Sequence, residues 1–117
     1  MVTVVIKKHN HLIKGFEIKG HALDEHTKGD LYDLVCNSVS VLSQSVLIGC
    51  IDVLKLKPSY EMKDGYLKLD MENLKSEKAE VLLETFEKSI ESTILGLDQE
   101  LGYKKSSRYI TLIDEEV

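Results

Sequence analysis

A histidine and a cysteine stand near each other in the first third of the chain. His21 follows a predicted strand in the segment Gly20-His21-Ala22, and Cys36 lies in the first turns of a helix that begins near Asp30 or Asp33. Backbone N–H groups and the helix dipole favour a thiolate at such a position, and a protonated imidazole beside it favours the thiolate further. The pair therefore predicts a cysteine nucleophile whose sulfur is ionised and reachable by solvent.

These residues also have purely structural interpretations. A cysteine on an apolar helix commonly packs as a small hydrophobic residue, and a histidine after a strand commonly lies at the surface. Asp33, one turn before Cys36, either caps the helix or orients the dyad. Ser40, one turn after Cys36, is either a supporting hydroxyl or an ordinary helical serine. The residues alone leave both interpretations open.

The helical periodicity places Cys36 beside the apolar face of its helix. At about 100° per residue, Cys36, Ser40 and Ser43 share a stripe roughly a quarter turn from the core stripe. That core stripe includes Val35 and Val39. We therefore expect Cys36 at the border of the core, with small hydroxyl side chains below it, as in the floor of a groove.

Hydrophobic patterning predicts five strands and two helices in the order β-β-α-β-β-α-β. Strands are expected at 2–6, 12–19 and 109–113 and a hairpin at 60–70, with helices from Asp30 or Asp33 to about residue 54 and from Ser76 to 101. Residues 22–29 are expected to form an exposed loop. Because hairpins make most of the sheet antiparallel and two amphipathic helices must cover it, we predict an α+β two-layer sandwich in one domain, residues 1–117.

The hairpin carries the most specific turn signal in the chain. Asp64-Gly65 is a favoured pair for a two-residue type I′ turn. Such a turn sets Met62 opposite Leu67 on one face. Two residues further from the turn, Tyr60 faces Leu69, so turn and apolar pattern predict the same register.

Composition narrows the class of protein. The 117 residues are 43% hydrophobic with a net charge of −5, which is usual for a soluble globular protein and argues against a nucleic-acid binder. We recognise no run of about 20 apolar residues that would span a bilayer and no targeting segment, so we expect a cytoplasmic protein.

The spacing of the two cysteines indicates that they act separately. Cys36 and Cys50 lie about 21 Å apart if they share one helix, which excludes a disulfide or a shared metal ion. We expect no metal or other cofactor.

At these residues the chain resembles the ribosomal-processing cysteine protease family, Prp. Its members pair a Gly-His-Ala or Gly-His-Ser segment with Gly-x-Asp-Ile-Val-Cys-Ala-x-x-Ser. Gly20-His21-Ala22 matches the first, and Asp33-Leu34-Val35-Cys36 with Ser40 matches the core of the second. The resemblance implies a small, often dimeric α+β peptidase with Cys36 as nucleophile, His21 as general base and Asp33 as the motif acid. Its substrate would be the N-terminal extension of the large-subunit ribosomal protein numbered twenty-seven.

The chain departs from the family pattern between the two motifs. Gly29 stands four residues before Asp33 rather than two, and fifteen positions separate His21 from Cys36, a longer spacing than in the family. A surface loop tolerates added residues, so we expect the dyad to persist. We predict a cytoplasmic, homodimeric cysteine endopeptidase that binds a peptide and neither nucleic acid nor membrane. The alternative is a non-catalytic module of the same fold that binds a peptide or a ribosomal component.

Overall fold

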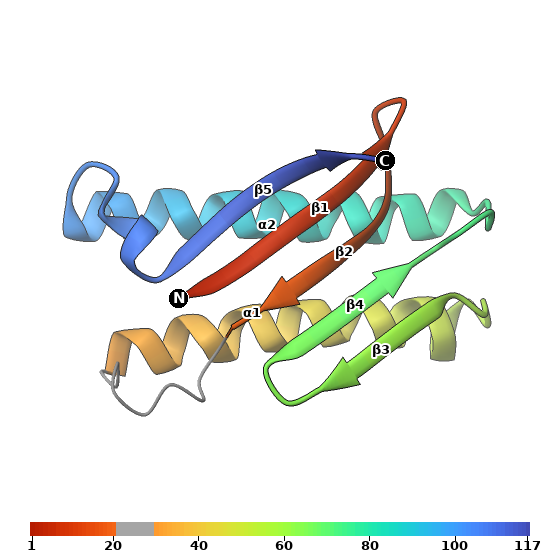
Figure 1. Cartoon of the computed structure of the whole chain (residues 1–117), viewed down its shortest axis with the longest axis horizontal. Helices are drawn as coiled ribbons and strands as arrows, with labels where there is room; N and C mark the ends of the chain where they lie inside the picture. Colours follow the sequence, from red (N-terminus) through yellow and green to blue (C-terminus); the bar gives the residue numbers. More distant parts are fainter. Residues whose placement is uncertain (21–29) are drawn as a thin grey trace.

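The computed structural model describes residues 1–20 and 30–117, apart from the side chains at positions 30, 32 and 33. It is a five-stranded sheet with two long helices packed on one face (Figure 1). The strands are β1 (Val2–His9), β2 (Leu12–Lys19), β3 (Ser59–Lys63), β4 (Tyr66–Asp70) and β5 (Ile110–Glu116). The helices are α1 (Asp30–Ile48) and α2 (Glu77–Leu101), with a π-helical turn η1 (Gly49–Val53) after α1 and a 3₁₀ turn η2 (Lys105–Arg108) before β5. The predicted element order and α+β class are confirmed.

The sheet has the strand order β3-β4-β2-β1-β5. Neighbouring strands are antiparallel except β1 and β5, which pair in parallel with Val2 opposite Ile110. The sheet is therefore mostly antiparallel, as predicted, and among the described residues its two edge strands are β3 and β5. The termini lie at opposite ends of adjacent strands, because β5 runs in the same direction as β1 (Figure 1).

The β3–β4 hairpin has the predicted register but not the predicted turn. Every predicted cross-strand pair is present. A type I′ turn needs positive φ at both central residues, whereas Gly65 has φ 74° and Asp64 is not among the residues with positive φ. The prediction of a type I′ turn here is therefore wrong, and a single left-handed residue at the second position is typical of a type II turn. Both central residues are left-handed in the β1–β2 turn, at Asn10 and His11.

The core fills the space between the sheet and the helices. Val2, Val4 and Ile6 of β1 are fully buried, because alternate residues of a strand face the helices. Phe16 of β2 stacks on Phe86 of α2 with ring centroids 4.5 Å apart. The same buried cluster includes Val35 and Val39 of α1, so the inner face of the sheet packs against both helices.

The helix that carries Cys36 is more apolar than we predicted. The 20-residue segment Leu34–Val53 has a mean hydropathy of 1.8 and is long and apolar enough to cross a membrane by length and composition. The prediction that no segment reaches this level is therefore wrong. The segment also supplies core residues, among them Val39 and Cys50, that pack against the sheet. We therefore interpret it as the core helix of a two-layer fold.

Candidate active site

Helix α1 turns Cys36 toward the sheet. Its side chain is 3% exposed and belongs to the same buried cluster as Val35 and Val39. Ser43, on the Cys36 side of the helix, is 1% exposed, whereas Leu42 is only half-buried. The expected position of Cys36 at the border of the core is therefore wrong, as is the expectation of a solvent-reachable sulfur. The border lies on the Leu42 side, where α1 faces the groove toward α2.

The position at which α1 begins limits how strongly the helix itself stabilises a thiolate at Cys36. The helix begins at Asp30, so Cys36 is its seventh residue and lies in the second turn. The unpaired N–H groups of a helix belong to its first four residues, and the dipole effect fades beyond the first turn. A thiolate at Cys36 therefore depends more on a neighbouring cation than the sequence alone suggested.

A small pocket adjoins Cys36 between α1 and one end of the sheet. Its volume is about 50 Å³, and its walls include Ser40 and Gln44 from α1 together with Met62, Lys63 and Tyr66 from the hairpin. A space of this size holds a water molecule or two rather than a peptide. A substrate carbonyl therefore reaches the sulfur only if these walls move apart or the peptide enters at the pocket's mouth.

Ser40 is held in place on the wall of this pocket. Its Oγ accepts a hydrogen bond of 2.8 Å from Nε2 of Gln44, one turn later on α1. Its backbone carbonyl accepts a 3.0 Å bond from the hydroxyl of Ser43. The structure therefore brings Ser40 and Cys36 to one pocket, as the sequence predicted. Sequence reasoning missed Gln44, although its spacing of four residues from Ser40 on a helix was the available signal.

The hairpin wall is fixed by a polar contact on the outer face of the sheet. The Tyr66 hydroxyl donates to Oε2 of Glu17, and the other carboxylate oxygen, Oε1, pairs with Nζ of Lys19 at 3.4 Å. The bond to Tyr66 holds the pKa of Glu17 below its usual value and, in return, raises the pKa of Tyr66 to about 12. Nζ of Lys63 lies 5.3 Å from the centre of the Tyr66 ring. Tyr66 is therefore a neutral hydrogen-bond donor at neutral pH.

The predicted partner of Cys36 cannot be placed in the same way. His21 falls in 21–29, outside the described residues, and the side chain of Asp33 is likewise outside them. The preceding residue is anchored, because the N–H of Gly20 donates to the carbonyl of Gly65 at 3.1 Å. Gly20 has φ 66°, and a Cβ there would lie 2.8 Å from the carbonyl oxygen of Met1, so glycine is required. The chain therefore arrives at position 20 beside the turn of the hairpin that lines the Cys36 pocket.

Metal-ligating side chains do not gather in the described part of the chain. Within residues 1–20 and 30–117, no group of three or more His, Cys, Asp or Glu side chains is arranged to hold a metal ion. Both cysteines are thiols rather than halves of a disulfide. Cys50 is fully buried, and this burial raises the pKa of its thiol.

Comparison with known proteins adds a family and a set of similar folds. Residues 1–101 match the family Peptidase_Prp, described as cysteine protease Prp. No curated protein shows a significant match.

Several solved structures have a similar fold. The structure of SMU.848 from Streptococcus mutans is 23% identical in sequence with a TM-score of 0.76, and the match covers 100% of this chain and 96% of that one. The ribosomal processing protease Prp from S. aureus, in complex with a covalently linked product peptide, is 19% identical with a TM-score of 0.75, covering 98% and 100%. With a substrate peptide it is 17% identical, with a TM-score of 0.77 and the same coverage. At these identities the likeness to solved structures shows the fold.

Proposed function

The chain belongs to the Prp family of cysteine proteases, and we propose that it removes the N-terminal extension of the large-subunit ribosomal protein numbered twenty-seven with a Cys36–His21 dyad. The observation that carries this proposal is the pocket at Cys36, where α1 and the hairpin enclose a thiol. The matching motifs Gly20-His21-Ala22 and Asp33-Leu34-Val35-Cys36 support the assignment of the two catalytic residues. The reaction takes place in the cytoplasm, where thiols stay reduced.

In the proposed reaction His21 takes the proton of Cys36, and the thiolate attacks the scissile carbonyl carbon. The peptide C–N bond then breaks, the amine leaves with the proton returned by His21, and the acyl group stays on the sulfur as a thioester. Water, deprotonated by His21, hydrolyses the thioester and releases the carboxylate product. The imidazolium that forms beside Cys36 stabilises the thiolate with its positive charge, whereas the helix dipole does little to stabilise it in the second turn of α1.

Ser40 and Asp33 have supporting roles in this proposal. Ser40 shares the pocket with Cys36, and the bond from Gln44 to its Oγ fixes where the hydroxyl lies. A fixed hydroxyl beside a developing charge stabilises it without reorganisation. Asp33 corresponds to the acid of the family motif and precedes Cys36 by three residues, close to one helical turn. We assign to Asp33 the role of orienting the His21 ring.

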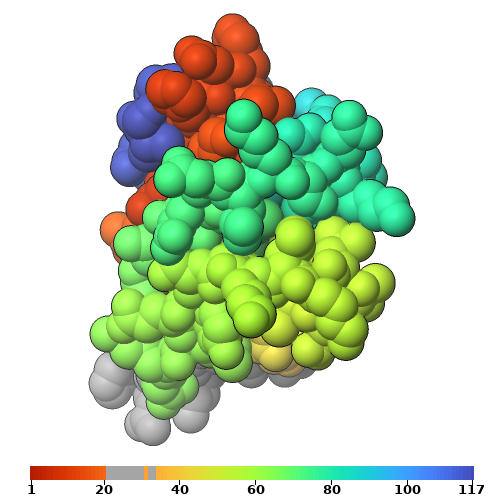
Figure 2. Space-filling view, turned by 90° about the vertical axis from the view of Figure 1, so that its right-hand side faces the viewer, coloured from red at the N-terminus to blue at the C-terminus, as the bar shows by residue number. Residues whose placement is uncertain are grey.

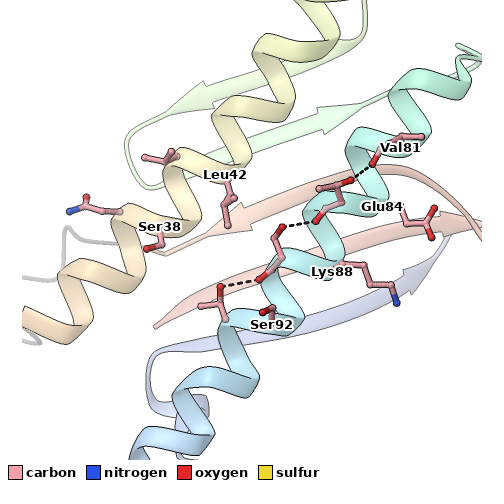
Figure 3. A pocket seen from close by; sticks show the side chains of 11 residues that line it. Ser38, Leu42, Val81, Glu84, Lys88 and Ser92 are labelled. Atoms are coloured by element: carbon pink, nitrogen blue, oxygen red, sulfur yellow. Dashed lines mark hydrogen bonds between the residues drawn. The ribbon is translucent and has the colours of Figure 1, made fainter.

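The proposed enzyme works as a homodimer through the outer face of its helices. Figure 3 shows the groove between α1 and α2, which has a volume of about 990 Å³ and includes Leu42 and Val81 in its lining. Along α1, Leu34, Val41 and Ile48 recur every seven residues and are each more than half exposed. Such an apolar stripe beside a groove is typical of a self-complementary interface, in which the ridge of one copy enters the groove of the other.

The cleavage reaction is tested directly with the extended ribosomal protein as substrate. Mass spectrometry is expected to show loss of the extension with the wild-type enzyme and no loss with Cys36→Ala or His21→Ala. An unchanged substrate mass after wild-type treatment overturns the substrate assignment. Equal cleavage by wild type and Cys36→Ala removes Cys36 from the mechanism. Binding of the extension without cleavage would instead favour the non-catalytic alternative.

A further inference from the structure

We propose that the free edge of β3 is a docking strand for the substrate, which pairs with it as a sixth strand and is led by it to the Cys36 pocket. The occupant is an extended segment of the peptide substrate. This inference rests on the proposed function, because it concerns the same reaction. It adds the surface that holds the peptide and the conformation in which the peptide is held.

The backbone of β3 is open on one side. β3 is the outermost strand of the sheet (Figure 1) and is paired only with β4 among the described residues. All five of its side chains are exposed. Lys63 and Tyr66 close the two-residue turn and form a hydrogen-bonded pair by the geometry of such hairpins. In an antiparallel ladder these pairs alternate, so the N–H and C=O groups of Met62 and Tyr60 point away from β4. An incoming strand finds two donors and two acceptors there.

The side chains of the same two residues are apolar and uncovered. Tyr60 is 53% exposed and Met62 is 56% exposed, whereas their partners on β4, Leu69 and Leu67, are 0% and 6% exposed. All four lie on the face of the sheet that the helices cover. Apolar side chains on a free edge strand promote aggregation, and natural proteins usually replace or shield them. A peptide strand added at this edge would cover them.

The docking edge is continuous with the pocket of the nucleophile. Met62 and Lys63, the last two residues of β3, line the same pocket as Cys36. A five-residue strand spans about 16 Å, so a peptide paired along β3 extends from the surface of the sheet edge to the mouth of this pocket. Figure 2 shows the green segment of the chain, which includes this hairpin, at the molecular surface.

The other edge strand lacks this combination of features. β5 ends in Asp114, Glu115 and Glu116 and is separated from β3 by the other three strands. Its end is tied to β1, because the N–H of Val117 donates to the carbonyl of Lys8. No residue of β5 lines the Cys36 pocket. The observations therefore favour β3 over β5 as the docking edge.

This geometry defines the chemistry of the bound segment. The segment is extended and carries apolar side chains at alternate positions, where they meet Tyr60 and Met62. Its backbone N–H groups that face β3 must be free to donate, so proline or N-methylation at those positions blocks pairing. The intervening side chains point toward the outer face, where Glu61 and Lys63 form an ion pair of 3.2 Å.

An N-methyl scan of the substrate tests the pairing with the unaltered enzyme. The probe is a synthetic peptide that spans the cleavage junction of the extended ribosomal protein, with one backbone N–H methylated at a time. We expect kcat/KM to fall about tenfold, equal to about 1.4 kcal/mol, at every second position over a stretch of about four residues. A loss without this period of two overturns the docking inference and leaves the proposed function standing. Absence of cleavage of the unmodified peptide overturns both.

A matched pair of variants tests the edge from the enzyme's side. Tyr60→Pro removes an outward N–H that β4 does not use, and Tyr60→Val removes the ring but keeps that N–H. We expect kcat/KM for the peptide to be about tenfold lower in Tyr60→Pro than in Tyr60→Val, mainly through KM. The alkylation rate of Cys36 by iodoacetamide should be the same in both variants, because the reagent does not use the edge. Equal kcat/KM in two folded variants overturns the inference.

Discussion

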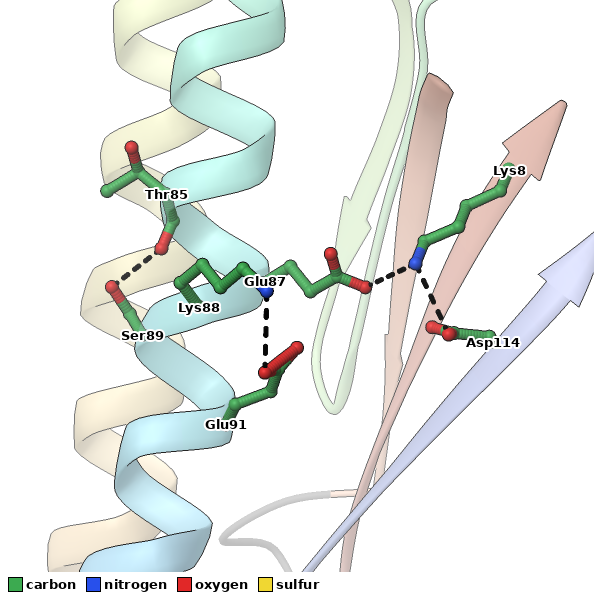
Figure 4. A network of polar contacts seen from close by, with 7 residues as sticks. All are labelled: Lys8, Thr85, Glu87, Lys88, Ser89, Glu91 and Asp114. Carbon is green, nitrogen blue, oxygen red and sulfur yellow. Dashed lines mark hydrogen bonds and ion pairs between the residues drawn. The ribbon is translucent and has the colours of Figure 1, made fainter. Parts of the chain in front are cut away.

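Nζ of Lys8 lies 2.7 Å from Oε2 of Glu87, so this ion pair joins β1 to α2 across the layer between sheet and helix (Figure 4). The Glu87 side chain is 9% exposed, and Lys8 also contacts Asp114 of β5 at 3.3 Å. The hydrogen bond with Glu87 is the largest cause that raises the pKa of Lys8. One ammonium group therefore ties the edge strand, its neighbour and the covering helix together.

Removing the buried member of this pair should destabilise the fold. Glu87→Ala leaves the Lys8 ammonium without its closest partner, and we expect a loss of about 2 kcal/mol in the free energy of unfolding. Glu91→Ala is the matched control, because Glu91 forms an exposed ion pair with Lys88 at 3.8 Å and should change stability by less than about 0.5 kcal/mol. Urea denaturation measures both. Equal stabilities of the two variants would contradict a structural role for the Lys8–Glu87 pair.

The Tyr66–Glu17 bond predicts a loss of stability at alkaline pH. The folded-state pKa of Tyr66 is raised to about 12, above the value of about 10 expected in the unfolded chain. Its contribution to stability is therefore fully present below pH 10 and lost as the pH rises toward 12. Denaturation midpoints measured from pH 9 to 12 should fall more steeply for the wild type than for Tyr66→Phe. Parallel curves for the two proteins would refute the assignment.

Two glycines should respond in opposite ways to alanine. A Cβ at Gly15 would lie 2.1 Å from the carbonyl oxygen of Leu69, whereas nothing lies within 4 Å of a Cβ at Gly96 in α2. Gly15→Ala must displace a backbone atom of the central sheet, so we expect destabilisation of more than about 3 kcal/mol. Gly96→Ala should stabilise the protein by about 1 kcal/mol, because alanine is the better helix former. Thermal denaturation followed by circular dichroism compares them.

The proposed dimer face is tested with two exposed valines. Val41 lines the groove between α1 and α2, whereas Val53 is 71% exposed in η1 and lies outside that groove lining. A buried glutamate opposes association, so Val41→Glu should be monomeric at a concentration where the wild type is dimeric. Val53→Glu should remain a dimer. Light scattering after size exclusion distinguishes them, and a monomeric wild type at high micromolar concentration would remove the dimer from the proposal.

The sequence predicted strand pairing best where the alternation of apolar residues and the length of the turn indicated the same register. Alternating apolar residues in 60–70 fixed the register of the hairpin, because a shift of one residue would expose Leu67 and Leu69. It did not fix the turn type, since Asp64-Gly65 suits more than one turn of two residues. The left-handed pair arose instead at Asn10 and His11, between the strands expected at 2–6 and 12–19.

The site was predicted in part, and the errors have a physical reason. A helical wheel gives the angle of Cys36 relative to Val39 but not how far the sheet extends over α1, so the burial of Cys36 was missed. The requirement for glycine at position 15 depends on a carbonyl more than 50 residues away in the chain. His21 stays a prediction, because it lies outside the described residues.

The two cysteines should differ in reactivity in the folded enzyme. Cys50 is fully buried, and burial raises the pKa of its thiol, so it should be alkylated only on unfolding. Cys36 is paired with His21 in the proposed mechanism and lines a pocket whose walls must move apart to admit a substrate. Because the same motion admits iodoacetamide, Cys36 should react with this reagent faster than free cysteine at pH 7. Peptide mapping by mass spectrometry locates the label. Cys50→Ala should keep the fast reaction, and Cys36→Ala should lose it.

His21→Ala should slow the labelling of Cys36 about tenfold or more, because the fraction of thiolate falls when the neighbouring cation is removed. Labelling of Cys36 that is slow at pH 7 and indifferent to His21 would show that the thiol is packed as a core residue, and the proposed dyad would have to be abandoned.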